Sequence, residues 1–423
     1  MIRIYLAVLA MISIPAMARA QDREPFGSGP AGPLLREDVA GSRQSPDAAP
    51  IGFDAGPVDV YPAMRVRVAG DSNVLGTPTN KRGDVFIGFE PEVAAAYRSA
   101  NVSIAARANA AIARYAKLTS QNRNGFSAGT DLRYDWGART TASAGASFTR
   151  AYERNLSVDA AAGSLSPARY DEVKGQAALT GEYGDVRATV TASLSRRDYA
   201  PVETVGGKEA DQSFRDATTG TLGGRVELAT SAGPTLIAET GVTWLDAIHP
   251  QRCCDRSSTT GRFLVGLRSD LIPLVRVEVL GGYLDRGYAS AAFRDYSGLI
   301  WRARAEWYAT PLITVALSSG RDLVSSGLPD VAGVQIDTTQ LKIYYEARRD
   351  FDITLGFTHA DEDYRDAGIA VRDNALALEW NYVFKPRRTA GGFMRWHDRK
   401  SNSNRLNTAG SAFESGLWFR LAI

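Results

Sequence analysis

Residues 299–308 read Leu-Ile-Trp-Arg-Ala-Arg-Ala-Glu-Trp-Tyr, and this stretch is the clearest indication of the fold. Every second residue from Leu299 to Trp307 is apolar, whereas the residues between them include Arg302 and Glu306. Successive side chains of a β-strand point to opposite faces, so one face of this strand is apolar and the other is charged. The sequence therefore predicts a strand that separates an apolar environment from water.

The same alternation continues from about Tyr61 to the end of the chain. It forms about eighteen strand-like stretches, among them 62–73, 351–364 and 408–423. Short connections alternate strictly with longer, more polar ones, which is typical of barrels with tight turns at one end and loops at the other. A soluble sandwich has no reason to gather its short turns at one end. We predict an all-β protein, a single antiparallel up-and-down transmembrane β-barrel of about 18 strands (16–20).

The N-terminal region differs in composition from the rest. Residues 1–20 have an early Arg3, a short apolar run and a small-x-small end at Ala18 and Ala20, which predicts a secretory signal peptide. Residues 21–60 are rich in Pro, Gly, Asp and Ser, which predicts a flexible, disordered periplasmic lead-in. A plug in the lumen is the alternative for this segment. Residues 61–423 are left for the barrel.

Aromatic residues gather near the predicted strand ends. In an outer-membrane barrel they form girdles at the two lipid–water interfaces, and arginine or lysine on the lipid face costs about 2–4 kcal/mol at the bilayer midplane. The charged face must then be the lumen. The expected girdle residues are Tyr97, Trp136, Tyr183, Trp244, Trp307, Tyr308 and Trp396.

The charged face supplies the candidate functional residues, which line the lumen and govern selectivity. The basic members are Arg65, Arg67, Arg107, Lys174, Arg187, Arg225, Arg268, Arg276, Arg302, Arg304, Lys342, Arg348, Arg395 and Arg420. The acidic members are Glu227, Glu278, Glu306, Glu346 and Glu379. One interpretation is a mildly basic pore wall that favours anionic solutes. The other is a set of cross-strand ion pairs that hold the wall, and a one-residue register slip would reverse every assignment.

Little in the composition points to catalysis or to a cofactor. The chain has three His, two Cys and a net charge of +2, so we expect no metal site, no cofactor and no nucleic-acid partner. Cys253 and Cys254 are adjacent in a predicted loop, where spare thiols or a vicinal disulfide is the expectation. A Gly-x-Ser-x-Gly string at 125–129 opens a predicted strand rather than a strand-turn-helix elbow. We predict that the protein is not an enzyme.

Two hairpins carry a family resemblance. In the first, a strand ends in an acidic-x-Asn-Val turn at 71–74 and a Thr-rich loop; in the second, an aromatic-rich strand turns through Tyr-x-Thr-Pro-Leu at 308–312. They resemble hairpins of the putative beta-barrel porin 2 family, and the order of elements matches from about Asp54 onward. The resemblance implies a bacterial outer-membrane β-barrel with no catalytic residue to carry over. Members are often encoded beside exopolysaccharide systems, which implies a role in polysaccharide export or surface assembly.

The C-terminal stretch predicts one partner. Leu417, Phe419, Leu421 and Ile423 share a face and resemble the terminal strand that outer-membrane barrels present to the barrel assembly machinery, although such strands usually end in Phe or Trp. The other expected partners are outer-membrane lipid, lipopolysaccharide and exopolysaccharide export components. The expected location is the outer membrane of a Gram-negative bacterium.

Three functional hypotheses follow from this pattern. The first is an outer-membrane porin that passes hydrophilic solutes, anionic ones included, or exopolysaccharide by passive, charge-biased diffusion. The second is a closed barrel whose outer loops act as a surface-assembly scaffold or bind glycan or a partner protein. The third is a membrane enzyme acting from the barrel rim through His249, His359, His397 or Ser127.

Overall fold

The computed structural model describes residues 39–42, 52–153, 164–204, 208–249, 255–403 and 409–422. The predicted signal peptide, Cys253, Cys254 and Ile423 lie outside the described residues. No helix in the described part of the chain has the length and apolar character needed to cross a membrane.

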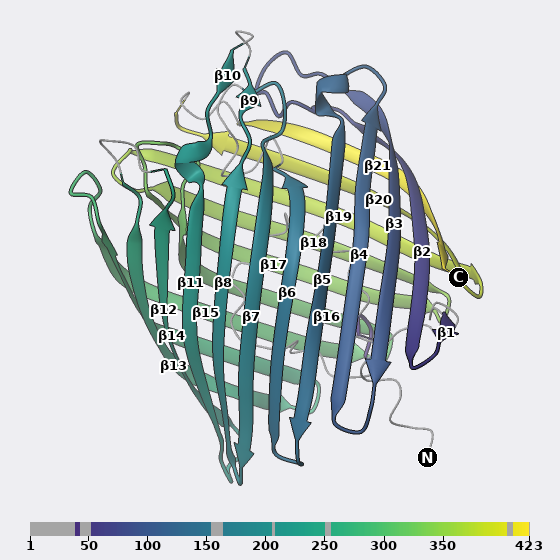
Figure 1. Cartoon of the computed structure of the whole chain (residues 1–423), viewed down its shortest axis with the longest axis vertical. Coiled ribbons are helices and arrows are strands. Elements are labelled where there is room, and N and C mark those ends of the chain that lie inside the picture. The colour runs from purple at the N-terminus through teal and green to yellow at the C-terminus, as the bar shows by residue number, and fades with distance from the viewer. Residues whose placement is uncertain are drawn as a thin grey trace.

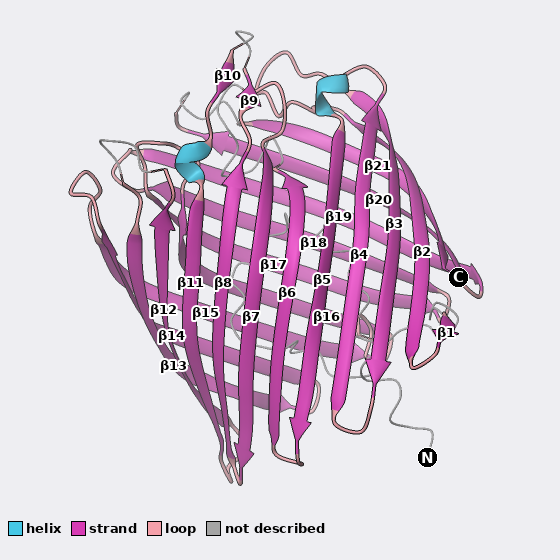
Figure 2. Ribbon diagram, viewed as in Figure 1, coloured by secondary structure: helices cyan, strands magenta, loops and turns pink. Residues whose placement is uncertain are grey.

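Eighteen antiparallel strands form one closed barrel, as predicted (Figures 1 and 2). The wall strands are β2 (Val58–Asp71), β3 (Asp84–Arg98), β4 (Val102–Tyr115), β5 (Arg123–Trp136), β6 (Thr140–Tyr152), β7 (Arg169–Tyr183), β8 (Val186–Tyr199), β11 (Ala217–Ala229), β12 (Thr235–Ala247), β13 (Ser258–Ile272), β14 (Val275–Tyr288), β15 (Tyr296–Thr310), β16 (Ile313–Ser325), β17 (Gly333–Arg348), β18 (Phe351–Tyr364), β19 (Ile369–Lys385), β20 (Arg388–Ser401) and β21 (Gly410–Ala422).

Each wall strand pairs with the next along the chain, and the first wall strand pairs with the last. In this closing seam, β2 and β21 run antiparallel from the pair Ala63–Ala422 to the pair Asp71–Glu414. β8 pairs directly with β11, because β9 (Val202–Glu203) and β10 (Glu209–Ala210) form a separate small hairpin in the loop between them. The short β1 (Phe53–Ala55) adds to β2. Two single-turn 3-10 helices, η3 (Thr119–Gln121) and η4 (Ser213–Arg215), also lie in loops.

The two ends of the barrel differ in their connections, as the sequence predicts. At one end the strands are joined by turns of two to five residues, such as Gly184–Asp185 between β7 and β8. Gly184 has a φ of 57°, which a tight two-residue turn requires and glycine adopts without strain. At the other end, drawn uppermost in Figure 1, the loops are mostly longer, and the one between β8 and β11 spans residues 200–216.

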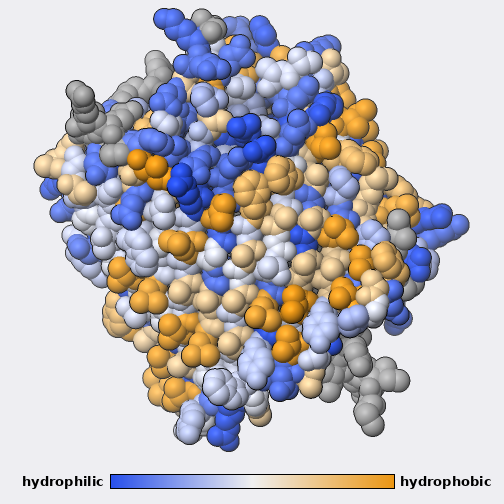
Figure 3. Space-filling model, in the orientation of Figure 1, coloured by the Kyte–Doolittle hydropathy of each residue, from blue (hydrophilic) through white to orange (hydrophobic). Residues whose placement is uncertain are grey.

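The outer face of the wall is apolar and exposed. Leu299 is 68% exposed and Leu417 64%, and large apolar side chains of this kind occur on strands all around the barrel. In Figure 3, apolar residues spread over the middle and lower part of the visible face, and hydrophilic residues gather toward the loop end. Water does not stably cover so large an apolar surface, so this belt faces lipid. Tyr308 is a correction to the predicted girdle: it lies on the inner face, buried, and donates a hydrogen bond to Glu306 at 2.6 Å.

The described parts of segment 21–60, which we expected to be flexible, have defined contacts. β1 and the first residues of β2 pair with each other near the turn end of the barrel. Farther upstream, Ala40 is completely buried, and a Cβ placed on Gly41 would lie 2.6 Å from the ring of Tyr344. Tyr344 belongs to the inner face of β17, so residues 39–42 lie against the inner wall.

Candidate functional site

Ion pairs between strands that are not neighbours identify the inner face of the wall. Arg225 of β11 reaches Glu278 of β14 at 2.9 Å, and Arg399 of β20 reaches Glu362 of β18 at 2.6 Å. Only on the concave face do side chains from separated strands converge. Counting every second residue along the paired strands places these predicted residues on the same face: Arg65, Arg67, Arg107, Lys174, Arg187, Arg225, Arg268, Arg276, Arg302, Arg304, Lys342, Arg395, Arg420, Glu227, Glu278, Glu306, Glu346 and Glu379.

Arg348 is the exception. The register between β17 and β18 shifts between Glu346 and Arg348, so that Arg348 lies opposite Phe351, which packs with the outward-facing Trp380 and Tyr382. Its side chain is 71% exposed and pairs with Asp350 at 3.2 Å. Arg348 is therefore a residue of the turn between β17 and β18 and not of the lumen wall, because the bulge reverses the alternation that the sequence implied.

A compact ionic network occupies the inner face of β11 to β15. We call it the neutral cluster, because its three guanidinium groups face three carboxylates: Arg225, Arg268, Arg302, Glu227, Glu239 and Glu278. Arg225 contacts all three carboxylates, at 2.6 Å for Glu227 and 2.9 Å for Glu278. Arg302 donates to Glu239 at 2.5 Å, and Arg268 to Glu227 at 3.0 Å.

Burial decides what the neutral cluster can do. The side chain of Arg225 is 4% exposed and that of Glu278 is 1% exposed. Buried charges persist only when they are paired, and removing one partner leaves an uncompensated charge in a medium of low polarity. Within this network each charged group has an oppositely charged partner, so the cross-strand pairs hold this part of the wall together.

Apolar side chains fill the space beside the neutral cluster. This buried group comprises Ile237, Leu264, Leu280, Leu284, Ile300 and Leu323. The backbones of β13 and β14 approach closely here, since a Cβ on Gly266 would lie 1.8 Å from the carbonyl oxygen of Val279 and a Cβ on Gly282 would lie 1.9 Å from that of Phe263. The inner face of β12 to β15 is consequently packed like a protein interior.

The inner face of β5 to β8 has the opposite character. Its side chains are mostly small and polar: Ser127, Gly129, Ser143, Gly145, Ser147, Thr180, Thr189, Thr191, Ser193 and Ser195. Among the longer ones, the side chains of Arg133 and Glu182 are 53% and 57% exposed, whereas Glu172 and Lys174 are half-buried. Small polar side chains leave room and bind water, so solvent reaches the inner face along this half of the wall.

A second arginine group lies on the closing seam. We define the seam cluster as Arg65 and Arg67 of β2, Glu90 of β3 and Arg420 of β21. Arg67 approaches Glu90 to 3.2 Å and Arg65 approaches the same carboxylate to 3.7 Å. Arg420 lies directly opposite Arg65 in the β2–β21 ladder. Arg65 and Arg67 thus share one carboxylate, and Arg420 adds a third cation beside them; Arg65, Arg67 and Glu90 are each 21–24% exposed.

Aromatic rings and glycines position the arginines of the seam cluster. The guanidinium carbon of Arg65 lies 4.7 Å from the ring centre of Trp418, and that of Arg67 lies 5.1 Å from Phe86. These are cation–π distances. The aliphatic part of Arg67 crosses Gly88, where a Cβ would lie 2.5 Å from its Cγ, and the ring of Trp418 covers Gly391. The two glycines allow these long side chains to lie flat on the wall.

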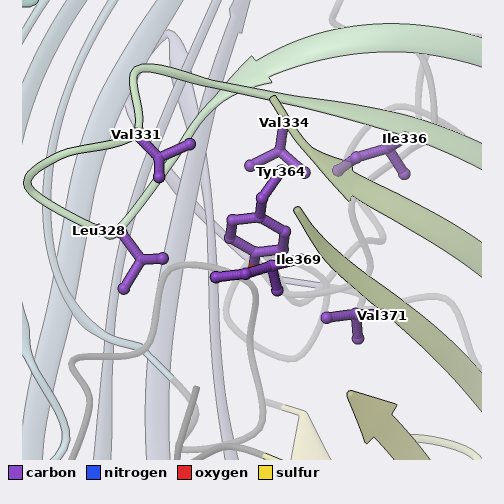
Figure 4. Close-up of a cluster of buried hydrophobic side chains, with 7 residues drawn as sticks. All are labelled: Leu328, Val331, Val334, Ile336, Tyr364, Ile369 and Val371. Atoms are coloured by element: carbon purple, nitrogen blue, oxygen red, sulfur yellow. The ribbon is translucent and has the colours of Figure 1, made fainter. Parts of the chain in front are cut away.

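One loop folds inward at the loop end. Residues 326–332, which we call the inner loop, connect β16 to β17 and pack against the inner face of β17 to β19 (Figure 4). Tyr364 is fully buried at the centre of this group, whose members are Leu328, Val331, Val334, Ile336, Tyr364, Ile369 and Val371.

Arg256, from the loop between β12 and β13, holds the inner loop. Its Nη2 lies 2.7 Å from the carbonyl oxygen of Ser326, 2.8 Å from that of Leu328 and 2.5 Å from that of Val331. Its guanidinium also lies 5.5 Å from the ring of Phe214 in η4. One buried cation therefore joins three loops at the loop end of the barrel, and it was not predictable from the sequence because loop contacts have no periodicity.

Two further buried pairs brace the loop end. Arg215 of η4 donates to Glu153, at the end of β6, at 2.6 Å, and the side chain of Arg215 is 4% exposed. Arg399 donates to Glu362 and, at 3.2 Å, to Asp373, which in turn bonds His397. These contacts fix loop ends and strand ends to one another.

The residues that the enzyme hypothesis named lie on different elements. Ser127 lies within β5 and donates to Asn109 at 2.5 Å, and His359 bonds Asn374 on the outer face. His249 lies beside Asp216 at the loop end. Among the residues that the structure describes, no group of three or more His, Cys, Asp or Glu side chains is placed to hold a metal ion.

Sequence reasoning missed several residues of this site. Glu90 and Glu92 share the inner face with Arg107, which approaches Glu92 to 3.7 Å, and the alternation within residues 84–97 could have identified both. The same alternation along the last strand could have assigned Trp418 to the inner face. Arg256 could not be found, because it lies in a loop.

Comparison with known proteins identifies the family. The family model described as "Putative beta-barrel porin 2" matches residues 45–419. No curated protein sequence matches the chain.

Solved structures of similar shape were also found. OccK2 (OpdF) of Pseudomonas aeruginosa is 10% identical, covering 86% of this chain and 97% of its own, with a TM-score of 0.49. OprD of the same organism is 12% identical, with 89% and 97% coverage and a TM-score of 0.44. The siderophore receptor PirA, also from P. aeruginosa, is 10% identical, with 86% and 80% coverage and a TM-score of 0.45. With TM-scores below 0.5, these likenesses carry no argument about function.

Proposed function

The chain belongs to the putative beta-barrel porin 2 family, and from this premise we propose that it is a Gram-negative outer-membrane porin passing hydrophilic solutes by passive diffusion with a bias toward anions. The observation that carries the proposal is the solvated inner face of β5 to β8. A barrel of this width has room for water, and small polar side chains there leave that room unfilled.

The bias toward anions rests on the charges that solvent can reach. The neutral cluster sums to zero and is buried except at Arg268, so it contributes little field to the lumen. The seam cluster has a net charge of +2, from three arginines and one glutamate, and is partly exposed. Charged groups at the wall of a narrow aqueous path select ions by sign without any covalent chemistry.

Planar-bilayer recording of the refolded protein tests the proposal. We expect discrete ohmic current steps. In a KCl gradient we expect a reversal potential shifted from zero toward the equilibrium potential of chloride. Silent membranes in the presence of protein that shows the heat-modifiable mobility of a folded barrel would contradict a pore.

A closed scaffold is the second candidate, and two observations favour it. The inner loop folds against the inner face of β17 to β19, and residues 39–42 pack against Tyr344. In that case the outer loops act in surface assembly or bind glycan or a partner protein. Exopolysaccharide is compatible with both candidates, as the molecule that passes through the porin or as the molecule that the scaffold binds. Genes for polysaccharide polymerisation and export beside this one would support it.

A further inference from the structure

The seam cluster differs from the neutral cluster in its balance of charge. In the antiparallel ladder Arg65 and Arg420 are direct partners, and like charges in that position destabilise a sheet. Arg67 lies two residues further along the same face. Glu90 is the carboxylate within 4.0 Å of Arg65 and of Arg67, and in the described part of the chain no ion pair forms at Arg420.

Unused hydrogen-bond donors accompany this excess charge. The Nε atoms of Arg65 and Arg67 are buried and donate no well-directed hydrogen bond within the part of the chain that the structure describes, although Arg67 Nε lies 3.2 Å from the carboxylate of Glu90. Buried donors are normally satisfied, and a guanidinium offers a planar fork that fits the two oxygens of a carboxylate or phosphate. Trp418 and Phe86 hold two of the three guanidinium groups in place, so the site is positioned before any ligand arrives.

The neutral cluster shows what this chain does where arginines serve the wall alone: it supplies one carboxylate for each. The seam cluster leaves two positive charges uncompensated on the joint that closes the barrel, where stability would favour neutrality. We propose that the seam cluster is a binding station for a carboxylate- or phosphate-bearing solute, whose anionic oxygens supply the missing charge and accept from Arg65, Arg67 and Arg420.

The ligand class follows from the chemistry of the site. The group must be anionic, must present at least two oxygens, and must be attached to a hydrophilic body that can travel along the polar face. An acidic sugar, free or as a unit of an acidic polysaccharide, has all three properties. This inference deepens the proposed function and depends on it for its role in transport, but binding itself can be measured without conductance.

The test uses galacturonate as the anionic probe, galactose as its neutral twin and oligogalacturonate as the polymeric form. Binding to the refolded, detergent-solubilised protein is followed by tryptophan fluorescence, because Trp418 contacts Arg65. We expect saturable binding of galacturonate and none of galactose. Arg420→Gln and Arg65→Gln should each weaken galacturonate binding about tenfold, since each removes a charged hydrogen-bond donor.

Two further variants keep the inference falsifiable. Glu90→Gln raises the net charge of the cluster and should tighten binding, the opposite direction to the arginine variants. Arg133→Gln is the matched control, because it removes an exposed inner-face arginine that pairs with Asp135 outside the seam, and it should leave binding unchanged. Equal binding of galacturonate and galactose, or no opposite shift between Glu90→Gln and Arg420→Gln, would overturn the proposal.

The outcomes separate this inference from the proposed function. Saturable binding without bilayer current would mean that the binding site exists in a closed barrel. The proposed porin function would then be wrong and the proposed binding site correct. Bilayer current without saturable binding would mean that the proposed porin function is correct and the proposed binding site is wrong. Oligogalacturonate that binds and blocks the current assigns the station to a polymer, whereas block by the monomer alone assigns it to a small solute.

Discussion

The neutral cluster and the seam cluster are built from the same residue types on the same face of the same wall, yet they serve different purposes. The first pairs three arginines with three glutamates and is buried except at Arg268, which is 30% exposed; the second places three arginines beside one glutamate and is partly exposed. A charged residue on the inner face of a barrel can therefore be assigned to solute binding only after the opposite charges around it have been counted. An arginine with a full complement of carboxylates is part of the wall, and one without it is available to a solute.

Removing a carboxylate from the neutral cluster should have the largest effect. Glu278→Gln leaves the buried Arg225 with one fewer charged partner, and breaking a buried ionic network in this way costs about 3–5 kcal/mol. Urea unfolding in lipid vesicles measures the loss. Glu182→Gln is the control, because Glu182 pairs with Arg187 at 3.6 Å in the exposed region and should change stability by about 0–1 kcal/mol. An equal loss of unfolding free energy in the two variants would contradict the distinction between buried and exposed charge.

Releasing the inner loop should have the next largest effect. Arg256→Ala removes the donor that three loop carbonyls share, and each buried acceptor left unsatisfied costs about 1–3 kcal/mol. The substitution destabilises the inner loop and not the barrel wall, so the barrel should keep its heat-modifiable electrophoretic mobility. We expect faster proteolysis within residues 326–332 and noisier single-channel currents. Unchanged proteolysis would show that the apolar contacts of the loop suffice to hold it.

A neighbouring pair of glycines tests the packing beside the neutral cluster. A Cβ at Gly282 would lie 1.9 Å from the carbonyl oxygen of Phe263, whereas one at Gly281 would meet nothing within 4 Å. Gly282→Ala should therefore destabilise the barrel by about 1–3 kcal/mol, as overpacking does in other interiors. Gly281→Ala, which points to the lipid, should be nearly neutral. The comparison of the two urea midpoints separates the packed inner face of β14 from its lipid-facing side.

The smallest effect should come from the seam cluster in the absence of ligand. Arg420→Gln removes a like-charge pair across the β2–β21 ladder, and such pairs contribute about 0.2–1 kcal/mol. We expect stability to stay constant or to rise slightly in anion-free detergent. A large loss of stability instead would make Arg420 a structural residue, and the seam cluster would then resemble the neutral cluster.

The alternation predicted most of the wall because a strand that separates lipid from water must repeat with a period of two. The predicted stretch 351–364 coincides with β18, and the predicted 62–73 differs from β2 (Val58–Asp71) by a few residues at each end. The inner-face assignments hold wherever the ladder is regular, and Arg348 fails because one bulge reverses the parity.

The sequence could not reveal which inner-face charges are compensated. Pairing between Arg225 and Glu278 depends on the curvature that brings β11 near β14, and no local pattern encodes it. The inner loop and its contact with Arg256 are equally invisible, because loops pack through three-dimensional arrangement and not through periodicity. The sequence therefore predicts the wall and its two faces, whereas the division of the lumen into a packed and a solvated half required the structure.

The chloride-to-potassium permeability ratio of the refolded protein tests the central claim most directly. Reversal potentials in a KCl gradient give this ratio for the wild type and for Glu90→Gln. We expect a ratio above one that rises further in Glu90→Gln, because the seam cluster carries uncompensated charge that solvent reaches. A ratio below one, or one that does not respond to Glu90→Gln, would contradict it.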